Sequence, residues 1–245
     1  MWMSWFPLAE DLTESPEFKK LTPTEKLFTL LLISKFNERG PFYLPDLEAA
    51  VTLRTSTKTI QRARKKLGTL NWIDFRPGFL DRYFRGVATL YMSVKFADPS
   101  EVIWFAQMPR FTFEALLFSL FNGTLEHKDI MTYVALTYLY WRMRGSYADN
   151  KEFFVTKTRL RELTGIYDAP ARAEWLSKTL KFSSGKSWFT CVVSGQRLIV
   201  REWDVPADSA KDERNRQILE AYRQRVMEEV RTLKERFAEA VEAVC

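Results

Sequence analysis

The chain has 245 residues, of which 46% are hydrophobic and 28% charged, and its formal net charge is +6. The hydrophobic share is enough for packed cores, which excludes a chain that is disordered throughout. The positive charge favours a polyanionic partner, either nucleic acid or an anionic membrane, although charge alone leaves open a basic protein without such a partner.

The N-terminal segment 1–20 begins with an apolar stretch that lacks the basic region of a signal peptide. We interpret it as an arm that docks on a core or on a partner. No apolar run approaches the ~20 residues that a membrane-spanning helix needs, so we expect no membrane partner. Cys191 and Cys245 form neither a CxxC pair nor a disulfide framework, which favours a reducing compartment.

Residues 21–97 open with two helices. Thr22 and Glu25 have the spacing of a capping box, and Gly40 marks the end of the helix that they begin. A second, short helix is expected from about Pro45, and the "RTST" sequence at 54–57 ends it.

A third helix and a hairpin complete this region. The helix is expected from about Thr57 to Leu67, with Ser56 or Thr57 as its cap. The β-rich segments that follow flank Pro77-Gly78, which predicts a hairpin turning there. Three helices followed by a hairpin is the order of a winged helix-turn-helix, whose third helix can enter a DNA major groove.

The same order recurs in residues 111–205, after a junction at 98–110. The recurrence is one of pattern, because few side chains are identical between the two regions. It rests on helix ends at Gly145 and Gly165, helix caps at Thr156 and Asp168, and a Ser194-Gly195 turn. The sequence therefore predicts a mainly α protein with small β-hairpins (α+β), built as tandem winged helix-turn-helix domains. We expect its aromatic residues to fill two small cores and the junction.

Residues 206–245 form a long, charged C-terminal helix. Its apolar residues recur every three or four positions, and the stripe drifts from a strict heptad. This drift favours docking on the body of the protein over a dimeric coiled coil, with a homodimer as the alternative. The stripe consists of Ile218, Tyr222, Val226, Val230, Leu233, Phe237, Val241 and Val244.

The third helix of the first domain has the pattern of a DNA-reading helix. Ile60, Ala63 and Leu67 fall on one side, which should be buried. From Thr55 to Asn71 the chain contains no acidic residue, whereas ordinary surface helices mix acids with bases. The side chains expected to contact base edges are Lys58, Gln61, Arg62 and Lys65. The residues expected to contact the DNA backbone are Thr57, Arg64, Lys66 and, in the hairpin, Arg76, Arg82 and Arg85. A solvated basic helix of a protein–protein module is the alternative.

The corresponding helix of the second domain is less suited to DNA. Ala169, Ala173, Leu176 and Leu180 should turn inward, which leaves Ala171, Glu174, Lys178 and Lys181 outward. We expect the first domain to read DNA and the second to bind weakly or to serve in assembly. Equal engagement of two half-sites is the alternative. The basic residues that could still reach DNA are Lys178, Lys181, Lys186, Arg197 and Arg201.

Residue patterns for catalysis are lacking. His127 is the only histidine, and we interpret it as a hydrogen-bonded surface residue. The sequence contains no cluster of Cys and His for zinc, no Walker lysine loop and no GxGxxG. We therefore expect no catalytic residue, no metal and no cofactor.

Residues 20–75 resemble the winged-helix domains of plasmid and phage replication initiation proteins, including those related to bacterial helicase-loading proteins. Such domains often place a glycine before the aromatic residue that opens the wing, and here that place holds Asn71. The resemblance is carried by Ser56, Lys58, Thr59, Ile60, Arg62, Ala63, Lys65 and Leu67, then by Leu70, Trp72 and Ile73.

This resemblance implies a non-enzymatic double-stranded-DNA-binding protein that takes part in DNA replication initiation in the bacterial cytoplasm or nucleoid. Replication proteins, a helicase or its loader, would be further partners. Two alternatives stay open: a transcriptional regulator with the same DNA contacts, and a non-catalytic adaptor of a larger nucleoprotein assembly.

Overall fold

The computed structural model describes residues 5–80, 87–144, 152–182, 184–203 and 213–242. The structure mixes helices with strands, and the strands form three small antiparallel sheets. Two successive regions, called here the first unit (residues 23–94) and the second unit (residues 127–201), each contain one three-stranded sheet.

The first unit has the predicted helices and a sheet of strand order β2-β4-β3. Thr22 Oγ1 accepts a hydrogen bond from the Glu25 N–H at 3.3 Å, and the Glu25 carboxylate accepts one from the Thr22 N–H at 2.7 Å, which confirms the capping box. Ser56, rather than Thr57, caps the third helix, because its Oγ accepts from the Thr59 N–H at 3.1 Å. The elements are α3 (Pro23–Arg39), β2 (Phe42–Pro45), α4 (Asp46–Thr52), α5 (Thr57–Thr69), β3 (Ile73–Leu80) and β4 (Val87–Val94).

The predicted turn at Pro77-Gly78 is wrong, because both residues lie inside β3. Pro77 pairs with Thr89, and a Cβ on Gly78 would lie 1.5 Å from the carbonyl oxygen of Ala88. Since β3 is at the edge of its sheet, a proline without an N–H is tolerated there. The connection between β3 and β4 consists of residues 81–86, which lie outside the described residues.

The second unit repeats the order of elements and the sheet topology, with strand order β6-β8-β7. Thr156 caps one helix, Gly165 ends it with φ +69°, and the hairpin turns at Gly195, as predicted. Asp168 precedes the next helix, but its carboxylate pairs with Arg172 at 2.9 Å instead of accepting from a helix N–H. The elements are α7 (His127–Arg144), β6 (Glu152–Thr156), α8 (Lys157–Thr164), α9 (Ala169–Thr179), β7 (Thr190–Ser194) and β8 (Arg197–Arg201).

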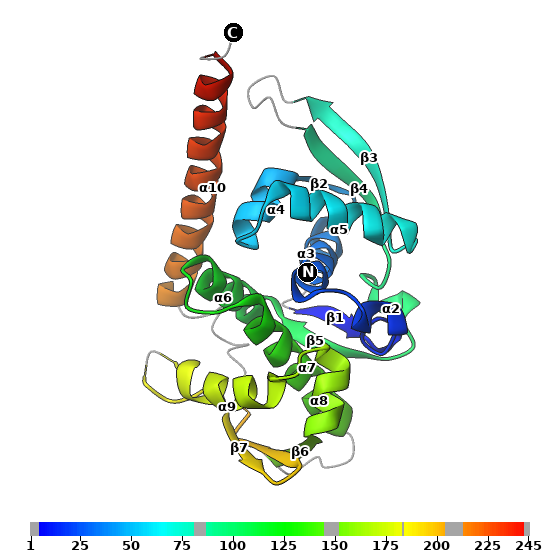
Figure 1. Ribbon diagram of the computed structural model, residues 1–245, viewed down its shortest axis with the longest axis vertical. Helices are drawn as coiled ribbons and strands as arrows, with labels where there is room; N and C mark the ends of the chain where they lie inside the picture. Colours follow the sequence, from blue (N-terminus) through cyan, green and yellow to red (C-terminus); the bar gives the residue numbers. More distant parts are fainter. Residues whose placement is uncertain (1–4, 81–86, 145–151, 183, 204–212, 243–245) are drawn as a thin grey trace.

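The N-terminal arm and the junction form the third sheet. Strand β1 (Trp5–Ala9) pairs antiparallel with β5 (Phe105–Pro109), and the two lie between the units in Figure 1. Phe6 and Leu8 are completely buried, and the buried side chains of both units form one continuous core instead of the two cores expected. The remaining short elements outside the two units are α1 (Glu10–Thr13), α2 (Pro16–Lys19), a 3₁₀ turn (Pro99–Glu101) and α6 (Arg110–Phe121).

The C-terminal helix α10 (Glu213–Glu242) docks on the body of the protein, as predicted. Tyr222, Val226 and Val230 are buried against α4 and α6, and the Tyr222 ring lies 5.2 Å from that of Phe118. In Figure 1 the helix runs upward from α6, and its C-terminal end lies far from the second unit. Leu233 is partly buried, and the side chains of Ile218, Phe237, Val241 and Val244 lie outside the described residues.

A buried lysine links the two units. Lys26 of α3 is completely buried, and its Nζ donates to the carbonyl oxygens of Thr164 at 2.5 Å and of Lys19 at 3.2 Å. Thr164 is the last residue of α8, so the bond joins α3 to the second unit. Burial disfavours the ammonium and lowers the pKa of Lys26 to about 8. A neutral amine still offers two N–H donors for the two carbonyls.

Lys26 should give the stability of the protein a specific pH dependence. Its folded-state pKa of about 8 lies below the ordinary value of 10.5, so between these values the unfolded chain binds the proton and the folded chain does not. The contribution of this group to the free energy of unfolding is therefore fully present above pH 10.5. It decreases as the pH falls from 10.5 and is lost as the pH falls through about 8.

We expect urea denaturation to show that wild-type stability, relative to Lys26→Met, increases from pH 8 toward pH 10.5. The other titrating groups are common to both proteins and cancel in this difference. Parallel pH profiles of the two proteins would show that Lys26 keeps an ordinary pKa when folded.

Candidate nucleic-acid interface

The outward face of α5 is cationic. Ile60, Ala63 and Leu67 are buried, as predicted, which turns the opposite face of the helix to solvent. None of the outward side chains forms an ion pair with another described residue, so their donors are available to a ligand. These exposed side chains are Lys58, Gln61, Arg62 and Lys65.

Arg64 turns inward instead of flanking this surface. Its guanidinium pairs with the Asp46 carboxylate of α4, donates to Thr89 Oγ1 of β4 at 2.8 Å, and lies 5.6 Å from the centre of the Phe75 ring. The Arg64 and Asp46 side chains are only 18% and 13% exposed. Arg64 thus fixes α5 to both α4 and the sheet, and its guanidinium is not turned to solvent in the way expected of a phosphate contact.

Lys66 also holds α5 to the rest of the first unit. Its Nζ lies 2.9 Å from the Glu25 carboxylate at the start of α3. Burial of this carboxyl opposes its ionisation, but hydrogen bonds from the Thr22 N–H and from Lys66 outweigh burial and lower the pKa of Glu25. Lys66 is 44% exposed, so it remains accessible at the rim of the cationic face.

The hairpin contributes one described basic residue. Arg76 is exposed on β3, opposite Leu90 of β4. Arg82 and Arg85, the other expected wing contacts, lie outside the described residues. Thr57 is half-buried at the first position of α5, next to the exposed Lys58.

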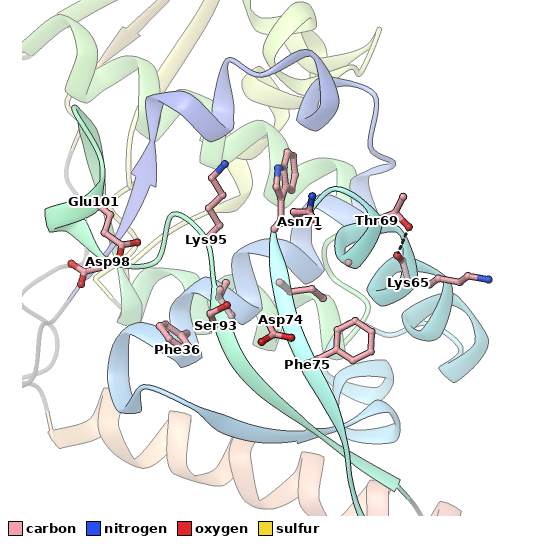
Figure 2. Close-up of a pocket in the computed structure, with 14 residues that line it drawn as sticks. Phe36, Lys65, Thr69, Asn71, Asp74, Phe75, Ser93, Lys95, Asp98 and Glu101 are labelled. Carbon is pink, nitrogen blue, oxygen red and sulfur yellow. Dashed lines mark hydrogen bonds between the residues drawn. The ribbon is translucent and has the colours of Figure 1, made fainter.

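A hollow of about 1010 Å³ opens beside the C-terminal end of α5 and the start of β3. The carboxylates of Asp74, Asp98 and Glu101 line it together with Lys65 and Lys95. In Figure 2 the ammonium of Lys65 points away from the hollow, which leaves a predominantly acidic lining. Such a lining repels phosphate, so the cationic surface ends at Lys65.

Arg54 is a further exposed basic residue near the other end of α5, and it is not among the DNA contacts predicted from the sequence. It is exposed, has φ +46°, and directly precedes the segment that caps the helix. A Cβ on Gly123 would lie 2.5 Å from its Nη1, so the α6–α7 connection lies beside it.

His127 is half-buried rather than a surface residue. Its Nε2 lies 2.6 Å from the carbonyl oxygen of Leu53, and burial lowers its pKa. This hydrogen bond joins the start of α7 to the segment that precedes α5.

The equivalent face of α9 has a different chemistry. Ala169, Ala173, Leu176 and Leu180 are buried, as predicted. Ala173, Leu176 and Leu180 have the spacing of Ile60, Ala63 and Leu67, which aligns the two helices. The positions of Lys58, Gln61, Arg62 and Lys65 are then occupied by Ala171, Glu174, Trp175 and Lys178.

The second-unit basic residues are exposed, but two of them are paired. Lys178 pairs with Glu174 at 3.0 Å, and Arg201 pairs with Glu152 at 2.6 Å. Lys181, Lys186 and Arg197 are exposed as well. Since Trp175 is 43% exposed beside a neutralised lysine, the outward face of α9 offers little to a phosphate backbone.

The described residues show no site for metal chemistry. Within them, no group of three or more His, Cys, Asp or Glu residues gathers as metal ligands. Cys191 is buried, and its burial raises the pKa of the thiol to about 12, which suppresses the reactive thiolate. No described helix combines the length and the apolar character that crossing a bilayer requires.

Comparison with known proteins gives no further information on this interface. No protein-family model matches the chain, and a search of curated proteins found no match either.

The different roles of the ion-paired Arg64 and the exposed Arg62 should appear in the free energy of unfolding of their alanine variants. We expect Arg64→Ala to lower the free energy of unfolding by about 1–3 kcal/mol, because it leaves the half-buried Asp46 carboxylate and the Thr89 hydroxyl without their donor. Arg62→Ala, the matched change at an exposed position of the same helix, should alter it by less than about 0.5 kcal/mol. Urea denaturation of the two variants checks this, and equal effects would contradict the assignment of Arg64 as an anchor.

Proposed function

We propose that this chain is a sequence-specific double-stranded-DNA-binding protein without enzymatic activity, built on two winged-helix units, that initiates replication of a plasmid or phage. The observation that carries the proposal is the outward face of α5. Four exposed donor side chains without ion-pair partners among the described residues stand opposite a fully buried face on one helix.

The dimensions of α5 support insertion into DNA. Its 13 residues make a helix of about 20 Å, and the major groove of B-DNA, about 12 Å wide, accepts an α-helix. Arg62, Lys58 and Lys65 would donate to guanine acceptors and Gln61 to adenine, the pairings that these side chains favour. The exposed side chains of Arg54, Lys66 and Arg76 would contact the phosphates.

The assignment to replication rests on the resemblance of residues 20–75 to initiator domains. The conformation of Asn71 supports it, because φ is +55° at the place where such domains often hold glycine. Asparagine is among the few residues that adopt this left-handed conformation readily.

The experiment is to select bound duplexes from a random pool and to measure affinity for the recovered duplex by fluorescence anisotropy over a range of salt concentrations. We expect Arg62→Ala combined with Lys65→Ala to weaken binding to the recovered duplex at least about tenfold and to reduce the preference for it over a random duplex, because both side chains are proposed to contact base edges. Lys178→Ala, which removes the ion-paired lysine of the equivalent helix, is the matched control and should change affinity less than about twofold. Wild-type protein that recovers no duplex would exclude the proposal.

Arg64 tests how the interface is built. We expect Arg64→Ala to weaken DNA binding while the salt slope stays at the wild-type value, because its guanidinium contacts Asp46 and not a phosphate. A salt slope that falls by about 1 would instead place Arg64 on a phosphate.

A transcriptional regulator could use the same DNA contacts. Replication of a plasmid that carries the selected duplex, with and without the protein, separates the two roles. Replication that depends on the protein and on Arg62 supports an initiator, whereas a change in transcription alone supports a regulator.

A further inference from the structure

The solvent face of the second unit's sheet carries a row of apolar side chains. Phe154 of β6 and Val192 of β7 both pair with Ile199 of the central strand β8, so the three side chains lie side by side on one face. Phe154 is 49% exposed and Val192 is 56% exposed, while Ile199 between them is half-buried.

The opposite face of this sheet already fills the core. Phe153, Val155, Cys191, Leu198 and Val200 are all buried. An antiparallel sheet with one buried face ordinarily presents polar side chains on the other face. A contiguous exposed apolar row on that face is therefore a signal of an interaction surface.

The charges beside the row define what can bind there. Arg201 lies on one side of the row and pairs with Glu152. Arg197 lies on the other side, between Thr156 and Ser194, and forms no ion pair with any residue of the described ranges. The face is therefore apolar in the middle with one uncompensated positive charge at its edge.

These charges disfavour a contact between this face and the same face of a second copy of the chain. Two such faces brought together would gather four arginines around two glutamates, and the excess of like charge costs free energy. Duplex DNA is disfavoured as well, because the apolar side chains in the middle of the face offer no hydrogen-bond donor to a phosphate. The C-terminal helix of the same chain lies against α4 and α6, with its end far from this sheet (Figure 1).

We propose that the solvent face of the β6-β8-β7 sheet binds an acidic amphipathic segment of a partner protein. Phe154, Ile199 and Val192 pack against its apolar side chains, and Arg197 pairs with one of its carboxylates. Three strands about 4.8 Å apart make a row about 10 Å wide, which matches the diameter of a single helix. The described part of the first unit lacks such a row, because Arg76 occupies the place of Val192 beside Leu90 and Tyr43.

The probe is a phage-displayed library of random peptides selected on the full-length protein, with the recovered peptides resynthesised for anisotropy. We expect them to combine apolar residues with Asp or Glu. Val192→Asp should weaken their binding at least about tenfold, because it places a charge in the apolar row and repels the acidic peptide. Tyr167→Ser, at an aromatic residue that is 82% exposed outside the sheet, is the matched control and should leave binding unchanged.

Charge reversal separates the role of Arg197 from general surface effects. We expect Arg197→Glu to weaken the acidic peptide about fivefold to tenfold, and a peptide with its acids replaced by lysine to bind Arg197→Glu better than wild type. Val192 and Arg197 are both exposed, so neither variant should impair folding.

Three results would overturn the proposal, whatever the outcome of the DNA experiments on α5. The first is that the recovered peptides bind the Val192→Asp variant as tightly as they bind the wild-type protein. The second is that the wild-type chain self-associates in sedimentation and the Val192→Asp variant is monomeric, which would assign the face to a second copy of the chain. The third is that Arg197→Glu lowers both the affinity for duplex DNA and the salt slope of that binding, which would assign the face to nucleic acid.

Discussion

The burial of one face of α5 is the constraint on which the proposed interface depends. With Ile60, Ala63 and Leu67 in the core, the 3.6-residue period of the helix leaves no freedom in the direction of the other side chains. The Arg64–Asp46 and Lys66–Glu25 ion pairs then tie the helix to α4 and α3. Two of the five basic side chains on α5 therefore orient it, and Lys58, Arg62 and Lys65 are left to meet a ligand.

The two units share one frame and present different surfaces. Strand order and helix order are the same, yet Trp175 stands where the first unit has Arg62, and Val192 where it has Arg76. A repeated fold whose outward residues differ in this way fits a division of labour, with one unit proposed to contact DNA and the other a protein. The continuous core and the buried Lys26 hold the two surfaces in a defined relation.

The sequence predicted the helices well because their ends depend on neighbouring residues. Thr22, Ser56, Thr156 and Gly165 act on backbone groups within four positions, so local patterns locate them. The Pro77-Gly78 turn was wrong because its local signal competes with strand pairing. An edge strand admits proline, and the close approach of Ala88 demands glycine at position 78.

The sequence allowed the outward residues of the proposed interface to be predicted, but not the ion pairs that hold α5 in place. Helical periodicity identified the exposed row, but the partners of Arg64 and Lys66 lie 18 and 41 positions away in the sequence. No local pattern shows such pairs, because only the packed fold brings them together. The same holds for Lys26 and Thr164, which are 138 positions apart, and for the merging of two expected cores into one.

Site-specific photocrosslinking to the selected duplex tests most directly whether α5 enters a DNA groove. A photoreactive amino acid would replace Gln61 in one protein and Glu174, its equivalent on α9, in another. The proposed arrangement predicts crosslinks to bases from position 61 and none from position 174. Crosslinking from position 174 with none from position 61 would contradict it.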